Sequence, residues 1–306
     1  MGNVFFFDWE VQLMLWIQAH LGSFGVKLAS LCSAFGEEMI LILVMGFCYW
    51  CWNKELGVFI GVNFCMANVW NPMLKNVALR RRPYFDTPVQ ILKSVDPNAD
   101  LYDIAAQGFS FPSGHSSGAV ATYGSIGAFS KRGWTTVIAI VIPLLVGISR
   151  FCVGAHYPTD VLCGWLLGCA AVFLLPLIGR LFQKKWVFYL VLAVTALPGF
   201  FYCRTNDFFT GYGMMAGFFL GNLFEERYVK FQSTRVWWKI LLRLVGGVAV
   251  YFVLNTVLKL PFDEAFLDSG TAAAYLVRTL RYTIVLFVDI AIYPMVFDRI
   301  GKKKEA

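Results

Sequence analysis

Residues 134–150 read WTTVIAIVIPLLVGISR, and after ten further residues, FCVGAHYPTD, a second apolar run, VLCGWLLGCAAVFLLPLIG, fills positions 161–179. A helix that crosses the hydrocarbon core of a membrane needs about 20 mostly apolar residues, and somewhat fewer when polar residues at its ends reach the interface. Each run meets this requirement, and polar or charged residues bound both. The stretch therefore predicts two membrane-spanning helices joined by a short polar loop.

Apolar runs of similar length recur along the chain. Nine of them qualify as spans: 37–52, 56–74, 116–130, 134–150, 161–179, 186–203, 210–224, 238–258 and 276–297. The preceding segment, 9–21, mixes Trp, Leu and Ile with Glu10, Gln12, Gln18 and His20, so it fits either an interfacial helix or a tilted first span that continues to Leu31. The expected fold is an all-α, polytopic membrane helical bundle with about nine or ten transmembrane helices.

The composition agrees with this expectation and excludes several other classes of protein. Of the 306 residues, 58% are hydrophobic and 15% are charged, whereas soluble domains have about 45–50% apolar and 25% charged residues. The eight cysteines lie mostly inside apolar runs, without the spacing of a disulfide framework or of a thiolate metal site. The acidic start, MGNVFFFDWE, lacks the basic region of a signal peptide.

Basic residues indicate the orientation of the chain. If the nine runs alternate across the membrane, 14 of the 26 Lys and Arg fall on one side: Lys54, Lys131, Arg132, Arg180, Lys184, Lys185, Arg227, Lys230, Arg235, Lys239, Arg299, Lys302, Lys303 and Lys304. Cytoplasmic loops carry an excess of Lys and Arg, so this side and the C-terminus are expected in the cytoplasm. The net charge of +7 then reports topology in a multi-pass cell-membrane protein and does not indicate nucleic-acid binding.

Three polar segments fall together on the opposite, extracytoplasmic side. The first reads KNVALRRRP and ends the 56–74 run, the second reads FPSGH and precedes the 116–130 run, and the third reads SRFCVGAHYPTD and follows the 134–150 run. Taken singly, each segment fits a bland interpretation, such as a snorkelling Lys, a juxtamembrane Arg cluster or a Ser-capped helix start. Three such segments at one membrane face are instead typical of a functional site.

The residue types in these segments suit phosphate chemistry. Lys75, Arg82 and Arg150 would repel one another unless an anion lay between them, and guanidinium groups bind phosphate oxygens in pairs. Ser113 and Gly114 precede a helix start, where backbone N–H groups and the helix dipole favour a phosphate. His156, with Asp160 to fix its tautomer, is a candidate nucleophile, and His115 is a candidate acid for the leaving oxygen. No acidic cluster suits Mg²⁺ and no tetrahedral set suits Zn²⁺, so no metal is expected.

The three segments together resemble the signature of the type 2 phosphatidic acid phosphatase superfamily, which includes membrane lipid phosphatases, glucose-6-phosphatase and the vanadium haloperoxidases. The pattern K-x6-RP, PSGH and SR-x5-H-x3-D is filled by Lys75…Arg82-Pro83, Pro112-Ser113-Gly114-His115 and Ser149-Arg150…His156…Asp160. The resemblance implies metal-independent hydrolysis of a phosphomonoester or pyrophosphate, without a cofactor, through a phosphohistidine. It also implies that Lys75, Arg82, Ser113, Gly114 and Arg150 hold phosphate, that His156 attacks, that Asp160 orients it and that His115 protonates the leaving group.

The resemblance divides the chain into an N-terminal interfacial helix or first span (1–34), a phosphatase core (35–179), and four additional spans with a basic tail (180–306). The expected substrate is a membrane lipid phosphate or polyprenyl pyrophosphate, and the sequence does not choose among such lipids. Two other functions stay open: a phosphotransferase with the same phosphohistidine, and a lipid transporter with a vestigial phosphatase core. The spacing Gly213-x3-Gly217-x3-Gly221 favours close helix packing within the chain and is also compatible with a homodimer.

Overall fold

A computed structural model describes residues 2–94 and 99–297 of the chain. In these ranges the regular elements are helices, and the only extended pairing is an isolated parallel bridge between Asn3 and Arg80. The chain divides into two compact units, Met1–Leu41 with Trp70–Ile178 and Ile42–Val69 with Gly179–Ala306. The N-terminal segment thus belongs to the same unit as the three motif segments, and residues 42–69, which the sequence places in the phosphatase core, belong to the other.

The first unit contains the long helices α1 and α8 and most of α9, with short helices between them. Its helices are α1 (Asp8–Ala34), the start of α2 (Glu38–Phe47), the end of α3 (Lys54–Ala78), α4 (Pro83–Asp86), α5 (Ile104–Gln107), α6 (Gly114–Ala119), η2 (Val120–Gly124), α7 (Ser125–Ser130), α8 (Gly133–Cys152) and α9 (Pro158–Gly179). α6, η2 and α7 follow one another without a break, and they form the predicted run 116–130.

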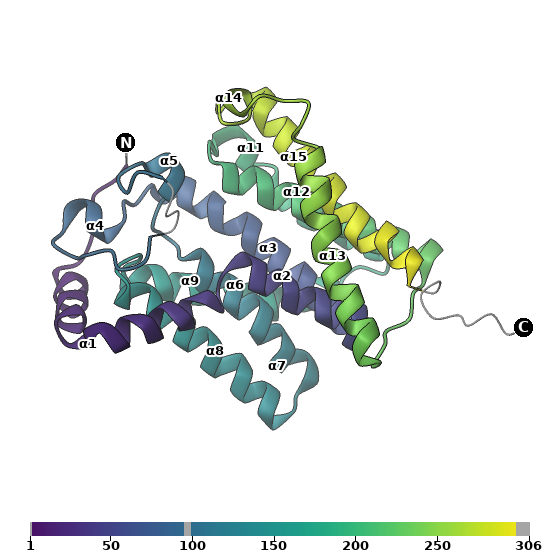
Figure 1. Cartoon of the computed structure of the whole chain (residues 1–306), viewed down its shortest axis with the longest axis horizontal. Helices are drawn as coiled ribbons and strands as arrows, with labels where there is room; N and C mark the ends of the chain where they lie inside the picture. The colour runs from purple at the N-terminus through teal and green to yellow at the C-terminus, as the bar shows by residue number, and fades with distance from the viewer. Residues whose placement is uncertain (1, 95–98, 298–306) are drawn as a thin grey trace, which may run out of the picture. The chain divides into compact units, whose positions relative to one another are not determined.

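In the first unit, α8 packs against α1 and against the α6–η2–α7 segment (Figure 1). α1 changes direction at Gly22, which has φ +58°, a conformation that costs glycine little. Between α8 and α9 the chain forms a loop that includes Gly154, with φ +78°. A side chain at Gly154 would meet the carbonyl oxygen of Gln90, so the loop fits closely against the segment that follows α4.

Apolar side chains of α1 cover the α8–α9 loop. Val11 and Met14 are buried against Tyr157 of this loop, and Ala29 is buried against Val153 and its neighbours. Burial of apolar area stabilises this contact by about 25 cal/mol per Å². The N-terminal helix therefore supports the loop that carries one of the predicted motif segments.

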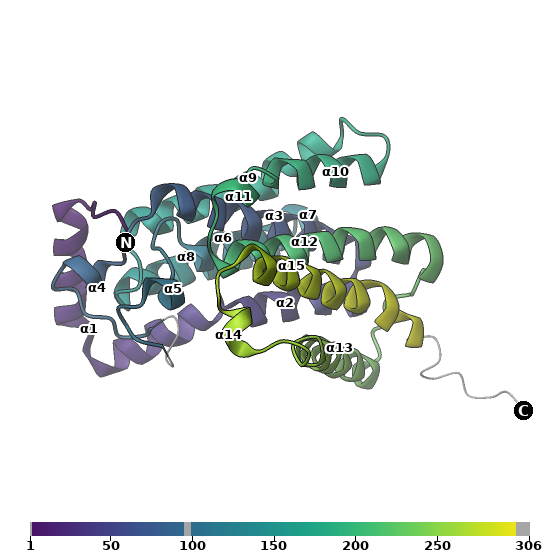
Figure 2. The ribbon, with the colours of Figure 1, turned by 90° about the horizontal axis from the view of Figure 1, so that it is seen from above.

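The second unit is formed around the helix pair α12 and α15. Its helices are the end of α2, η1 (Cys48–Trp52), the start of α3, α10 (Lys185–Ala196), α11 (Gly199–Tyr202), α12 (Asn206–Phe224), η3 (Glu225–Val229), α13 (Trp237–Val257), α14 (Glu264–Leu267), α15 (Ala272–Phe287), η4 (Val288–Ile292) and η5 (Tyr293–Val296). α12 and α15 run side by side (Figure 2). A Cβ at Gly213 or Gly217 would collide with the α15 backbone, and one at Gly221 would lie 3.0 Å from Ile290 Cβ. The glycine stripe therefore packs helices within the unit.

All nine predicted runs fall in helices, but length and composition support a smaller number of spans. Five of the described helical segments are long and apolar enough to cross a membrane: Gly133–Cys152, Pro158–Gly179, Lys185–Tyr202, Trp237–Val257 and Ala272–Val296. α1 and the segment Glu38–Trp52, bent by 48° to each other, bring the number to six if together they form one span. The number of nine or ten is therefore not confirmed, since α3 carries asparagines (Asn63, Asn68, Asn71) and the α6–α7 segment is short. The basic residues Arg299 and Lys302–Lys304 lie outside the described residues.

Candidate active site

The first two motif segments place their functional residues at helix ends of the first unit. Lys75 lies in the last turn of α3, and Arg82 immediately precedes α4. Ser113 precedes α6 and accepts a hydrogen bond from the backbone N–H of Ser116 at 3.4 Å, and Gly114 is the first residue of α6. The sequence forms a helix start here because a serine at this position satisfies an N–H group that has no partner within the helix.

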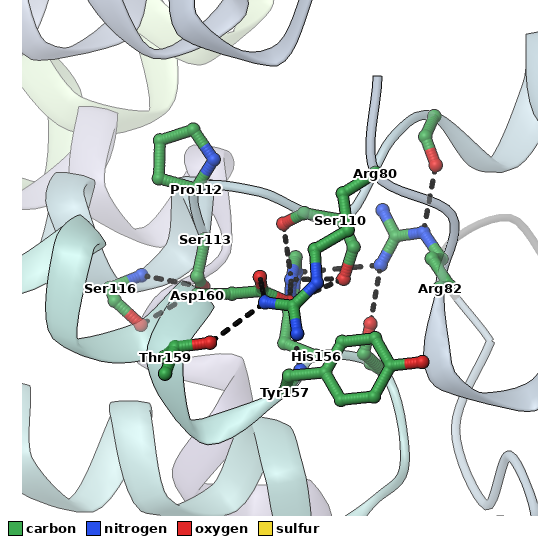
Figure 3. A network of polar contacts seen from close by, with 12 residues as sticks. Arg80, Arg82, Ser110, Pro112, Ser113, Ser116, His156, Tyr157, Thr159 and Asp160 are labelled. Atoms are coloured by element: carbon green, nitrogen blue, oxygen red, sulfur yellow. Dashed lines mark hydrogen bonds and ion pairs between the residues drawn. The ribbon is translucent and has the colours of Figure 1, made fainter. Parts of the chain in front are cut away.

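The third motif segment surrounds the α8–α9 loop. Arg150 lies in the last turn of α8, His156 lies in the loop, and Asp160 lies in the first turn of α9. The backbone carbonyl of Asp160 accepts a hydrogen bond from Ser113 N at 2.9 Å. This bond joins the start of α6 to the start of α9 (Figure 3), so the second and third motif segments are held together directly.

The imidazole of His156 is buried and has a defined orientation. Its Nδ1 lies 2.8 Å from the backbone carbonyl oxygen of Ser110. A carbonyl oxygen accepts only, so Nδ1 carries the proton and Nε2 carries the lone pair. Nε2 lies 3.4 Å from Nη1 of Arg82. The nitrogen that is available to form a bond therefore faces the guanidinium group that the sequence assigns to phosphate.

The surroundings keep His156 neutral. Burial lowers the pKa of its imidazole well below the ordinary value of 6.5, and the positive charges of Arg82, Arg150 and Lys75 lower it further. The hydrogen bond to the Ser110 carbonyl acts in the opposite direction but does not reverse the shift. A neutral imidazole is the form of a histidine side chain that can act as a nucleophile.

Asp160 contacts His156 less directly than the sequence predicts. Its Oδ2 lies 3.6 Å from His156 Nδ1, which is longer than a hydrogen bond. The same oxygen accepts hydrogen bonds from Ser110 Oγ at 2.5 Å and from the backbone N–H of Tyr157 at 2.8 Å. The Ser110 carbonyl therefore fixes the tautomer of His156, and Asp160 acts on the ring through its charge and through Ser110 (Figure 3).

The guanidinium group of Arg82 is held by backbone carbonyl oxygens. Its Nε donates to Gln107 O and Gly108 O at 3.0 Å each, its Nη2 donates to Gln107 O at 2.7 Å, and its Nη1 donates to Ala155 O at 2.9 Å. Carbonyl dipoles fix the group in place without neutralising its charge. Arg82 therefore holds a positive charge in a fixed position beside His156.

Arg150 and His115 complete the group. The Nη1 of Arg150 donates to Ser33 Oγ at 2.5 Å, and its buried Nε has no hydrogen-bond partner within the described part of the chain. His115 is half-buried, and burial together with Arg150, His156, Arg82 and Lys75 lowers the pKa of its imidazole well below 6.5. The same three cations, Lys75, Arg82 and Arg150, therefore act on both histidines.

Several residues of the site were not predicted from the sequence. Ser110 contacts both His156 and Asp160, Ser33 binds Arg150, and Arg80 binds Asp160 at 2.6 Å between Nη1 and Oδ1. In the sequence Arg80 is indistinguishable from the neighbouring juxtamembrane arginines, and Ser110 and Ser33 belong to no motif.

Glu10, which binds Arg80, was also missed, although the sequence holds a signal for it. It lies one helical turn before Met14, on the buried face of α1, and a carboxylate on a buried face requires a cation.

Two family descriptions match the chain. The first, the PAP2 superfamily, matches residues 56–186, and the second, the transmembrane extension of PAP2 superfamily phosphatases, matches residues 209–305. The chain belongs to the PAP2 superfamily. The last three of the four C-terminal runs therefore lie within a known extension of this family, and the run 186–203 lies before it. The three motif segments lie inside the first matched range.

Three characterised relatives share part of the chain. An undecaprenyl-diphosphatase of Sulfolobus acidocaldarius is 32% identical over 127 residues, which are 40% of this chain and 54% of the relative. Phosphatidylglycerophosphatase B of Bacillus subtilis is 44% identical over 75 residues (22% and 37%), and the bacitracin transport permease protein BcrC of Bacillus licheniformis is 28% identical over 142 residues (43% and 62%). The chain thus spans roughly a third to two thirds of the length of these relatives. No solved structure matches it.

Proposed function

We propose that this PAP2 member is an integral-membrane phosphatase that hydrolyses a lipid phosphate or a polyprenyl pyrophosphate through a phosphohistidine, without a metal ion. The observation that carries the proposal is the buried, neutral His156, whose Nε2 lies 3.4 Å from Arg82 Nη1 within a group of three cations. Among the described residues, no three His, Cys, Asp or Glu side chains are grouped as metal ligands. The cations would therefore supply the charge that stabilises the transition state.

The substrate phosphate would bind between Lys75, Arg82 and Arg150, with the start of α6 at Ser113 and Gly114 beside it. Its negative charges would offset the repulsion among the cations and raise the pKa of His115, which then takes up a proton from solvent. The lone pair on His156 Nε2 forms the N–P bond while the bond from phosphorus to the lipid oxygen breaks. That oxygen receives the proton of His115 and leaves as an alcohol, or as a monophosphate when the substrate is a pyrophosphate.

Hydrolysis then reverses these roles. His115, now neutral, removes a proton from a water molecule whose oxygen forms a new bond to phosphorus. The N–P bond breaks, its electron pair returns to His156 Nε2, and inorganic phosphate leaves. The positive charge that the phosphorylated ring carries between the two steps is stabilised by the Ser110 carbonyl and by the carboxylate of Asp160, 3.6 Å from Nδ1.

The relatives support a lipid substrate. Two of them are named for undecaprenyl diphosphate and phosphatidylglycerophosphate, which share a phosphate or diphosphate at the end of a membrane-anchored chain. A site at helix ends suits such a molecule because its apolar part stays in the bilayer while its phosphate reaches the cations.

The sidedness belongs to the same proposal. With nine spans, the 14 basic residues face the cytoplasm and the catalytic segments face the opposite side. We expect a Cys at Asp100 to react with a membrane-impermeant maleimide in intact cells, and a Cys at Gln232 to react only after permeabilisation. Both positions are exposed, and both variants are made in a chain that lacks the eight native cysteines. The reverse pattern would contradict the extracytoplasmic site.

Purified protein tests the proposed activity directly. We expect phosphate release from at least one member of a panel of phosphatidic acid, phosphatidylglycerophosphate and undecaprenyl diphosphate, undiminished by EDTA and inhibited by vanadate. Adding a lipid alcohol as acceptor distinguishes hydrolysis from phosphotransfer, because a phosphotransferase would move the phosphate to the acceptor instead of releasing it. Absence of both release and transfer across the panel, or strict dependence on added Mg²⁺, would contradict the proposal.

A further inference from the structure

A buried chain of charged groups connects the N-terminal helix to the candidate nucleophile. Glu10 Oε2 lies 2.7 Å from Arg80 Nη2, and Arg80 Nη1 lies 2.6 Å from Asp160 Oδ1. The side chains of all three residues are at most 1% exposed. Beyond Asp160, the chain continues through Ser110 to His156 (Figure 3). Residues 10, 80 and 160 thus form one network although 70 and 80 positions separate them in the sequence.

Arg80 is fixed by its neighbours as well as by the two carboxylates. Its Nε donates to the carbonyl oxygen of Phe5 at 2.9 Å, and its Nη1 also donates to Thr159 Oγ1 at 2.7 Å. The guanidinium carbon lies 4.0 Å from the centre of the Tyr157 ring. The position of Arg80 between the N-terminal segment and the α8–α9 loop is therefore strongly determined.

The residues before α1 are attached to the same region. Asn3 N donates to Leu79 O at 2.7 Å, and Arg81 N donates to Asn3 O at 3.1 Å. Gln18 of α1 exchanges two hydrogen bonds with the backbone of Gln90, at 2.7 and 3.1 Å. The N-terminal segment lies outside both family matches, the first of which begins at residue 56, yet it contributes a buried charge to the candidate site.

The net charge of the network indicates a role for Glu10 besides that of binding the N-terminal helix to the rest of the unit. Arg80 alone would cancel the charge of Asp160, and the ring of His156 would then have no net negative charge beside it when it becomes positive on phosphorylation. With Glu10 included, two carboxylates and one guanidinium carry a net charge of −1. A difference of one charge has a strong effect on a buried group such as His156, because solvent screens it little.

We propose that Glu10 is a positioning residue for the proposed phosphoryl transfer: by pairing with Arg80, it leaves Asp160 with the net negative charge that supports phosphorylated His156. The inference rests on the proposed function. A purely structural alternative exists, since Glu10 also accepts hydrogen bonds from the backbone N–H groups of Phe7 and Thr159, both at 3.0 Å. The two roles predict different results when Glu10 and Arg80 are replaced together.

Three variants separate the roles: Glu10→Gln, Arg80→Met and the double variant. Glu10→Gln keeps the shape and one amide oxygen but removes the charge, so we expect kcat to fall roughly 10- to 100-fold, the range seen when outer partners of a functional histidine are removed. We expect KM and the inhibition constant of inorganic phosphate to stay unchanged, because Lys75, Arg82 and Arg150 are untouched. The double variant removes Arg80 as well and restores the net charge of −1, so its kcat should exceed that of either single variant by at least about threefold.

Glu225→Gln is the matched control. Glu225 is equally buried, lies 2.6 Å from Lys54 Nζ, and accepts a backbone N–H from Phe231 at 3.0 Å. Among the residues that the structure describes, neither Glu225 nor Lys54 forms a hydrogen bond or ion pair with a histidine. We expect its kcat to equal that of the wild type. Size-exclusion profiles and thermal unfolding in detergent show which variants are folded. If Glu10→Gln does not fold, the double variant compared with Arg80→Met carries the same test.

The outcomes are distinct. Wild-type kcat in Glu10→Gln would overturn the inference, and so would a double variant no better than the worse single variant, because a structural role adds losses instead of reversing them. A parallel rise of KM and of the phosphate inhibition constant in Glu10→Gln would also overturn it. If the wild type and His156→Ala released phosphate equally, the proposed function would fall and this inference with it. If His156→Ala lost phosphate release while Glu10→Gln kept the kcat of the wild type, this inference would be contradicted and the proposed function would stand.

Discussion

Each unit of the chain buries one glutamate against one cation, and the two pairs are closely similar. Glu10 lies 2.7 Å from Arg80 in the first unit, and Glu225 lies 2.6 Å from Lys54 in the second. Both carboxylates are completely buried and both accept a backbone N–H at 3.0 Å. The burial of the glutamate and its pairing with a cation therefore do not distinguish them.

The two pairs differ in what the cation contacts besides its glutamate. Arg80 continues to Asp160 and, through Ser110, to a neutral histidine. Lys54 lies over the ring of Phe231, 4.7 Å from its centre, and holds the turn that follows η3. A buried ion pair acquires a functional meaning from the reactive group that it reaches, so we expect the first pair to govern turnover and the second to govern stability.

The largest effect is expected at the end of the first network. His156→Ala removes the group that would form the N–P bond, and we expect kcat to fall by at least about 10³-fold while the protein stays folded, because loss of a nucleophile commonly has effects of this size or larger. Phosphate release per folded molecule measures it. Residual activity within tenfold of the wild type would show that another residue is the nucleophile.

The pH profile sharpens the comparison, because the first network reaches the proposed nucleophile, His156. A lowered pKa means that His156 remains neutral when the pH falls through 6.5, and attack stops only when the ring is protonated at lower pH. Because His115 is also neutral in the free site and takes up a proton when substrate binds, we expect kcat/KM to rise as the pH decreases from 7.5 to 6.5 and to fall only at lower pH, where His156 becomes protonated. The ionisation of the substrate phosphate, followed by phosphorus NMR, is the control. An acidic limb centred at or above pH 6.5 would contradict the assignment.

The second network is expected to affect stability and leave turnover unchanged. Glu225→Gln leaves Lys54 without its charged partner, but Lys54 is 24% exposed, so we expect a loss of about 1–2 kcal/mol in the free energy of unfolding. Thermal unfolding in detergent and kcat of the folded fraction measure the two quantities separately. A tenfold loss of kcat would show that the second pair also supports catalysis.

The smallest effect is expected for the ion pair between Lys185 and Glu226, both of which are more than a third exposed. Lys185→Ala should change the free energy of unfolding by about 0–1 kcal/mol, as is usual for exposed pairs. This variant gives the baseline for the preceding one. A destabilisation equal to that of Glu225→Gln would mean that burial of an ion pair does not determine how much the pair contributes to the free energy of unfolding.

The elements that were predicted best are those whose signal is local. The runs 134–150 and 161–179 are confirmed as α8 and α9, because an uninterrupted apolar run determines a helix without reference to the rest of the chain. The three motif segments belong to one unit, and each of them lies at the end of a helix. The sequence does not determine the number of spans, since helices with polar positions, such as α3, do not differ by composition from buried helices.

The remaining features depend on tertiary pairing, which no local pattern encodes. The spacing of His156 and Asp160 suggested a direct contact, but His156 lies in a loop before α9 and its Nδ1 meets the Ser110 carbonyl. The contact between Glu10 and Arg80 joins residues 70 positions apart. It depends on the packing of α1 against the α8–α9 loop.

The central claim is that His156 carries the phosphoryl group during turnover. Purified protein is mixed with a ³²P-labelled lipid phosphate, quenched in alkali within milliseconds, digested, and analysed by mass spectrometry under conditions that preserve phosphohistidine. We expect acid-labile label on the peptide that contains His156, and no label in His156→Ala. Label on His115 instead, or label that survives acid on a serine such as Ser110 or Ser113, would contradict the account.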